Sequence, residues 1–131
     1  MNAQDVPYTA EDTALLLIDP YNDFLSEGGK LWSRVKEVAE EIKLLDHMRA
    51  VLSAAREKGF RVFIVPHHQT EPGDYKTWDH LSPTQKRVVE GQTFAAGSWG
   101  AEWHPDFVPR ENELVVRQHW ASVASRTRTW T

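Results

Sequence analysis

One short stretch near the N-terminus constrains the fold more than any other part of this chain. From Thr13 to Asp19 the sequence reads TALLLID, an unbroken apolar run that ends in a carboxylate, followed by Pro20. A run of this length without alternation is typical of a central strand buried on both faces. The chain must turn at Pro20, because proline cannot continue a strand ladder. Asp19 is therefore expected at the carboxyl end of the strand, where open α/β sheets bind ligands. The alternative is an ordinary turn or cap residue.

A helix and a second strand are predicted to follow. Residues 33–58 carry apolar side chains three or four positions apart or at sums of those steps, which predicts one long helix with a single buried stripe. That stripe consists of Val35, Val38, Ile42, Leu45, Leu52 and Ala55. Ser33 can cap this helix and Gly59 can end it. Residues 61–65 form a second apolar strand, stopped by Pro66. Strand, helix and strand together predict a βαβ unit with parallel strands.

The second half of the chain is predicted to be mostly loop, from Pro66 to Asn112. It contains one helix signal, Ser-Pro-Thr-Gln at residues 82–85, which has the pattern of a capping box with proline at the first helical position. This helix is predicted to run to Glu90. A third strand is predicted at residues 113–117. Uncovered loops of such length are uncommon in compact domains and are usually functional.

Composition excludes several classes of function. A chain of 131 residues, 40% of them hydrophobic, suits a single globular domain. The net charge of −4, without a basic stripe, argues against a nucleic-acid partner. No apolar run is long enough to span a membrane, and residues 1–12, an expected irregular arm, lack the apolar core of a signal peptide. We therefore expect a cytoplasmic protein. The sequence contains no cysteine, and hence no disulfide, thiolate metal site or cysteine nucleophile.

Several segments of the chain resemble one enzyme superfamily. Residues 16–24, LLIDPYNDF, resemble the first motif of the isochorismatase-like cysteine hydrolases, which include isochorismatases, nicotinamidases and N-carbamoylsarcosine amidohydrolases. Residues 66–78, 97–109 and 119–122 resemble later segments of the same superfamily, in the same order. The resemblance implies an α/β fold, a three-layer α/β/α Rossmann-like sandwich with a parallel sheet, whose strand order begins three-two-one.

The resemblance also implies part of an active site. The catalytic triad of the family is Asp, Lys and Cys, and Asp19 matches its acid/base member. The region where the lysine is expected reads VRQHW at residues 116–120, so this sequence offers no lysine there and no cysteine anywhere. The candidates to line a substrate pocket are Phe24, His67, Trp99, Trp103 and His119. Core or interface packing is the alternative for the aromatic side chains.

Two adjacent histidines raise the question of a metal site. Neighbours on an extended chain point in opposite directions, so His67 and His68 are poorly placed to chelate one ion. The spacing of Asp74 and His80 does not match the metal site of the nicotinamidase branch. We therefore expect no metal and no cofactor, with one histidine at the pocket mouth and the other solvated. A metal-dependent hydrolase using His67, His68 and Asp74 is the weakest alternative.

The resemblance ends near Ser122, and residues 123–131 depart from it abruptly. Legal codons for Val123 to Thr131 can be chosen so that reading from the third base of the valine codon gives Ser-Phe-Ala-Asn-Thr-Asp-Leu-Asp. That translation is close to the continuation of the family. We therefore expect residues 13–122 to be an incomplete isochorismatase-like domain, truncated after the third strand, and residues 123–131 to be an aberrant tail produced by a frameshift. A disordered tail is the alternative.

Two classes of function follow from these observations. In the first, the chain is an inactive fragment of a cysteine hydrolase that acts on a small amide-like or vinyl-ether substrate. In the second, it is a non-catalytic binding or assembly module that retains half of the pocket. Without a fourth strand, the first strand would expose an apolar edge, so we expect poor solubility or self-association. A homo-oligomer is compatible with such an edge.

Overall fold

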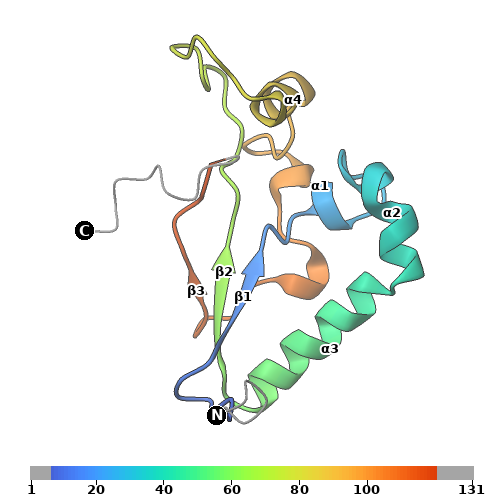
Figure 1. Cartoon of the computed structure of the whole chain (residues 1–131), viewed down its shortest axis with the longest axis vertical. Coiled ribbons are helices and arrows are strands. Elements are labelled where there is room, and N and C mark those ends of the chain that lie inside the picture. Colours follow the sequence, from blue (N-terminus) through green and yellow to red (C-terminus); the bar gives the residue numbers. More distant parts are fainter. Residues whose placement is uncertain (1–6, 121–131) are drawn as a thin grey trace.

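The computed structural model describes residues 7–120 (Figure 1), so the predictions for residues 1–6 and 121–131 lie outside the described part. The elements follow one another in an alternating order that alone indicates an α/β protein. They are β1 (Ala14–Ile18), α1 (Asn22–Leu25), α2 (Trp32–Glu41), α3 (Leu44–Glu57), β2 (Arg61–Val65), α4 (Pro83–Gly91), the 3₁₀ turns η2 (Trp99–Ala101) and η3 (Pro105–Phe107), and β3 (Leu114–Val115).

The three strands form one parallel sheet in the order β1-β2-β3. Leu17 pairs with Ile64, which in turn pairs with Val115 on the other side. This sheet confirms the α/β fold class, the parallel βαβ unit and the three-two-one strand order. β3 is shorter than predicted, but its pairing with β2 continues beyond the strand. The Val116 N–H donates to the Ile64 carbonyl at 2.9 Å, and a bridge joins His67 to His119.

The predicted burial of β1 on both faces is wrong for the described residues. Alternate side chains of a strand point to opposite faces of its sheet, and only one face of β1 is covered. Leu17 is 7% exposed, whereas Leu16 and Ile18 are 56% and 58% exposed. The covered face contributes to a core made of Leu17, Leu25, Leu52, Ala55, Val62, Ile64 and Phe107.

The predicted long helix is two helices. Lys43 adopts a left-handed conformation, with φ of 52°, and this interrupts the helical ladder between α2 and α3. Val38 and Ile42 are exposed and do not join the predicted buried stripe. The prediction for Ser33 is also wrong, because the N-cap residue of α2 is Leu31. The stripe survives on α3, where Leu52 and Ala55 are buried against the sheet.

The predicted capping box of α4 is confirmed. The Gln85 N–H donates to Ser82 Oγ at 3.2 Å, and the Ser82 N–H donates to Gln85 Oε1 at 2.8 Å. Both bonds satisfy N–H groups that the first helical turn cannot pair by itself. α4 lies beyond the carboxyl end of β2, away from the sheet (Figure 1).

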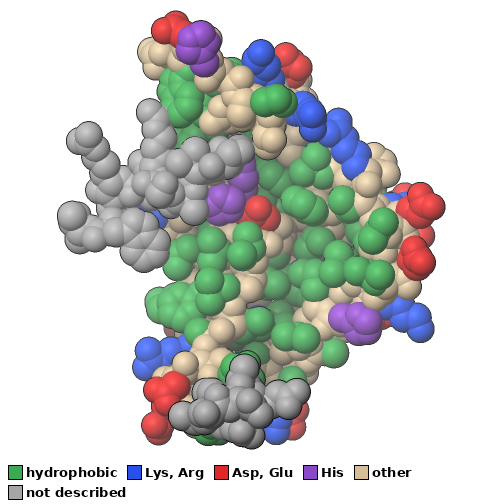
Figure 2. All heavy atoms as spheres, in the orientation of Figure 1, with side chains coloured by type: hydrophobic (Ala, Val, Ile, Leu, Met, Phe, Trp, Pro, Cys, Tyr) green, Lys and Arg blue, Asp and Glu red, His purple; other side chains and the backbone are tan. Residues whose placement is uncertain are grey.

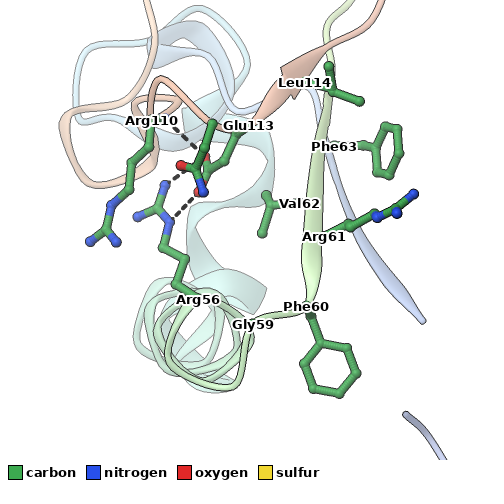
Figure 3. Close-up of a pocket in the computed structure, with 10 residues that line it drawn as sticks. Arg56, Gly59, Phe60, Arg61, Val62, Phe63, Arg110, Glu113 and Leu114 are labelled. Carbon is green, nitrogen blue, oxygen red and sulfur yellow. Dashed lines mark hydrogen bonds and ion pairs between the residues drawn. The ribbon is translucent and has the colours of Figure 1, made fainter. Parts of the chain in front are cut away.

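An ion pair ties α3 to the start of β3. Arg56 donates to both carboxylate oxygens of Glu113, at 2.6 and 3.0 Å, and the Arg110 N–H donates to Glu113 at 3.0 Å (Figure 3). These residues line a cavity of about 420 Å³ at the amino ends of β2 and β3. The cavity is therefore at the opposite end of the sheet from Asp19. Among residues 7–120, no helix is long and apolar enough to cross a membrane.

Candidate active site at the carboxyl ends of the strands

Asp19 directly follows β1, and a strained turn holds it there. Its φ is 53°, in the left-handed region that non-glycine residues seldom occupy. The Asp19 N–H donates to the Val65 carbonyl at 3.0 Å, and the Asp19 carbonyl accepts from the Tyr21 N–H at 2.7 Å, across Pro20. These two bonds fix the backbone from which the carboxylate projects.

The carboxylate of Asp19 meets the imidazole of His119, a residue one hundred positions away. Asp19 Oδ1 and His119 Nε2 are 2.8 Å apart, and both side chains are mostly buried. The pairing of β2 with β3 positions His119, because its N–H donates to the Pro66 carbonyl at 2.9 Å and its carbonyl accepts from the His68 N–H at 2.6 Å. Asp19 follows β1 and His119 follows β3, on either side of β2, and their side chains meet because all three parallel strands end at the same edge of the sheet.

His67 is the third polar side chain of this group and is only 6% exposed. Its Nδ1 lies 2.7 Å from the His68 carbonyl, and its ring stands edge-on to that of His119 with ring centres 5.2 Å apart. Burial lowers the pKa of His67, although the bond to the His68 carbonyl and the charge of Asp19 act in the opposite direction. The structure therefore brings together three of the predicted site residues.

Tyr21 is a member of the site that the sequence analysis missed. Its hydroxyl donates to the His67 carbonyl at 2.9 Å, and its ring stacks on Trp103 with centres 5.1 Å apart. Burial, together with the charge of Asp19, raises the pKa of Tyr21 to about 12. The hydroxyl therefore remains a neutral donor that supports the backbone of His67. Only its place two residues after Asp19 could have indicated this role.

The predicted pocket aromatics separate into different environments. Trp103 joins the site through Tyr21, and both line a cleft of about 430 Å³. Phe24 stacks on Phe94, whose ring contacts that of His67. Trp99 is 49% exposed, and its backbone carbonyl accepts from Asn22. The cleft is completed by Pro66, Gln69, Val115, Val116, Arg117 and Gln118.

Asp23, which the sequence analysis also did not identify, is a buried carboxylate that holds two loops together beside the site. It is 2% exposed, its Oδ1 accepts from the Lys30 N–H at 3.0 Å, and its Oδ2 accepts from the Phe94 N–H at 2.8 Å. A Cβ on Gly100 would lie 2.3 Å from this carboxylate, so only glycine fits there. Asp23 thereby fixes the loop that carries Phe94 against His67.

The expectation that one of the two adjacent histidines is solvated is wrong. His68 Nε2 lies 3.0 Å from Asp74 Oδ2, and the His68 ring stacks on Trp120 with centres 3.7 Å apart. His67 faces Asp19 and His119 instead, so His67, His68 and Asp74 do not converge. Within the described part of the chain, no cluster of three or more histidine or carboxylate side chains could hold a metal ion.

The sheet order and the polar group at its carboxyl edge are those of a parallel α/β protein with a site at the strand ends. A family model described as the isochorismatase domain matches residues 13–130. The chain therefore belongs to the isochorismatase family, which confirms the resemblance inferred from its motifs.

Curated relatives of the chain share one name. It is 20% identical over 123 residues to the ureidoacrylate amidohydrolase RutB of Klebsiella pneumoniae subsp. pneumoniae, covering 86% of this chain and 52% of that protein. It is 22% identical over 125 residues to RutB of Caulobacter segnis, covering 88% and 52% respectively. For RutB of Pantoea ananatis the identity is 21% over 121 residues, covering 85% and 48%. The chain thus spans about half the length of these relatives.

Proposed function

We propose that this chain carries the acid/base part of a hydrolase site for a small amide-like or vinyl-ether substrate, with Asp19 as the proton-transfer group. The observation that carries the proposal is the position of Asp19 at the carboxyl end of β1, with Oδ1 2.8 Å from His119 Nε2. Ligands of open α/β sheets bind at this edge. Family membership supports hydrolysis as the class of reaction. The name of the relatives suggests a ureido amide as the first substrate to test.

The proposed role of Asp19 is to take the proton of a nucleophile as that nucleophile attacks the substrate carbonyl. The C–N bond of an amide would then break, the amine would leave with a proton, and water would release the acyl group. The sequence contains no cysteine, so these 131 residues do not include a thiol nucleophile. We therefore propose that the chain by itself does not turn over substrate.

The candidates to surround the substrate are Phe24, His67, Trp99, Trp103 and His119. Of these candidates, only Trp103 lines the cleft of about 430 Å³, together with Tyr21; Asp19, His67 and His119 are not among its lining residues. A cleft of this size beside the strand ends suits a small-molecule ligand. The negative net charge is a further reason to propose a small molecule rather than a nucleic acid.

A test supplies the nucleophile from solution. The purified chain is incubated with ureidoacrylate or a vinyl ether, with and without a small thiol such as 2-mercaptoethanol. We expect no turnover without the thiol. With the thiol, we expect hydrolysis or thiolysis that falls about 100-fold in Asp19→Asn, in the range of general-base effects. The exposed carboxylate Asp79 provides the matched control, Asp79→Asn, which should leave the rate unchanged. Turnover without thiol, or an unchanged rate in Asp19→Asn, would contradict the proposal.

A second candidate is a non-catalytic binding or assembly module. The observation that favours it is the open face of β1, where Leu16 and Ile18 are more than half exposed. Large apolar surface of this kind commonly marks an interaction site. Saturable binding of the amide by the chain, with no thiol-dependent turnover, would favour this candidate over the hydrolase.

A further inference from the structure

The two histidines of the site differ in the ring nitrogens that they use. His119 directs Nε2 to Asp19 Oδ1 at 2.8 Å, and its Nδ1 lies 3.4 Å from the Trp120 carbonyl. His67 directs only Nδ1 to a partner, the His68 carbonyl, at 2.7 Å. A carbonyl oxygen only accepts hydrogen bonds, so His67 Nδ1 must carry the hydrogen and donate. Because burial lowers the pKa of His67, a second proton on its Nε2 is disfavoured. The Nε2 atom of His67 therefore presents a lone pair.

The lone pair of His67 Nε2 is available to a ligand. Within the described residues, His67 Nε2 has no hydrogen-bond partner, and neither does Asp19 Oδ2, since Oδ1 is the oxygen bound by His119. No completely buried side-chain nitrogen or oxygen in residues 7–120 lacks a partner. His67 Nε2 and Asp19 Oδ2 therefore both reach accessible space. Both atoms are hydrogen-bond acceptors.

We propose that His67 is a ligand-recognition residue whose Nε2 accepts a hydrogen bond from an N–H group of the ligand, with Asp19 Oδ2 as a second acceptor. This inference rests on the proposed function, because it takes the carboxyl edge of the sheet as the ligand site. An NH₂ group of a primary amide or a urea brings two donors to two acceptors. An ether oxygen brings only an acceptor, so an ether ligand would cover the His67 nitrogen without donating a hydrogen bond to it, which is costly.

The test observes the imidazole nitrogens directly. The chain is labelled with ¹⁵N-histidine, and long-range ¹H–¹⁵N correlations report which nitrogen of each ring carries hydrogen. We expect His67 to be protonated at Nδ1 and bare at Nε2. Acetamide is then titrated against N,N-dimethylacetamide, which keeps the carbonyl but has no N–H. Acetamide should move the His67 Nε2 resonance and bind at least about tenfold more tightly, as the loss of one hydrogen bond to an acceptor that the ligand covers predicts.

Several results would overturn the inference. They are protonation of His67 at Nε2 with a bare Nδ1, equal affinity for the two amides, and no shift with either amide. His67→Phe keeps an aromatic ring beside Phe94 and should abolish the discrimination, while His47→Phe on the exposed face of α3 should preserve it. If His67→Phe does not fold, the inference is still tested in the wild-type chain by the tautomer of His67 and by the relative affinities for the two amides. The measurement needs no turnover, so failure of the thiol-dependent reaction with an intact acetamide shift would overturn the proposed function alone.

Discussion

The two faces of β1 have nearly the same composition and opposite environments. Leu17 lies on the face that packs against α3 and is 7% exposed, whereas its neighbours Leu16 and Ile18 lie on the other face and are 56% and 58% exposed. Hydrophobic side chains gather over β1 and between β1 and α3 in Figure 2. An apolar run therefore identifies a strand, but the elements that cover each face decide how much of its apolar surface contributes to stability.

A matched pair of truncations on the two faces of β1 should show the largest difference in stability. Leu17→Ala should lower the free energy of unfolding by about 3 kcal/mol, because it removes buried methyl groups and leaves a cavity. Leu16→Ala, one residue away, should lower it by less than about 1 kcal/mol, since its side chain is mostly solvated already. Urea unfolding monitored by tryptophan fluorescence would measure both. Equal losses would mean that the second face of β1 is covered in solution.

The ion pair that joins α3 to the start of β3 should have the next largest effect on stability. Arg56 and Glu113 have side chains 15% and 4% exposed, and the Arg56 guanidinium holds the pKa of Glu113 below its usual range. Glu113→Gln leaves Arg56 without its charged partner and should cost about 2 kcal/mol. The exposed pair of Lys36 and Glu27 is the control, and Glu27→Gln should change stability little. Similar small effects in both variants would show that Glu113 does not tie α3 to β3.

How much of this could be read from the sequence depended on the range of the interactions. The capping box at Ser82 and Gln85 is local, and it was predicted correctly. The break at Lys43 was not, because nothing in the local pattern demands a left-handed residue there. The roles of Tyr21 and Asp23 depend on partners 46 and 71 residues away, which no periodicity reveals. The motif around Asp19 identifies this residue, but its contact with His119 depends on the parallel pairing of β1 with β2 and of β2 with β3.

Acid should lower the free energy of unfolding by a smaller amount, through two buried histidines. Burial lowers the pKa of both His67 and His104, and His104 Nδ1 accepts from the Asp106 N–H at 3.1 Å. The unfolded histidines take up protons near pH 6.5, but the folded ones resist, so this stability is present above about pH 6.5 and is lost as pH falls toward the folded pKa values. The free energy of unfolding should fall by about 1–2 kcal/mol between pH 7.5 and 5.5.

A single variant separates the contributions of His67 and His104 to this pH dependence. His104→Asn keeps an acceptor for the Asp106 N–H but does not titrate, so it should remove part of this pH dependence and leave the stability at pH 7.5 nearly unchanged. Urea unfolding at several pH values would measure the slope. Stability that rises as pH falls from 7.5 would be opposite to the predicted sign.

A charge on the open face of β1 should have the smallest effect on stability of the variants considered, and its main effect should be on self-association. Leu16→Lys places a charge on exposed apolar surface, so it should change the free energy of unfolding by less than about 0.5 kcal/mol. It should also reduce any self-association through this face, because a second chain packed there would have to bury the new charge. Sedimentation velocity of wild type and variant over a range of concentrations would measure this. A monodisperse wild-type monomer would contradict the expected self-association.

The central claim is that this chain holds the acid/base part of an isochorismatase-family hydrolase site and that its 131 residues omit the nucleophile. The most direct measurement is the rate of amide hydrolysis by the wild-type chain and by Asp19→Asn, each with and without a small thiol. The account predicts thiol-dependent turnover by wild type that falls about 100-fold in Asp19→Asn. Equal rates in the two proteins, or turnover by wild type without thiol, would contradict the account and leave the binding module as the better explanation.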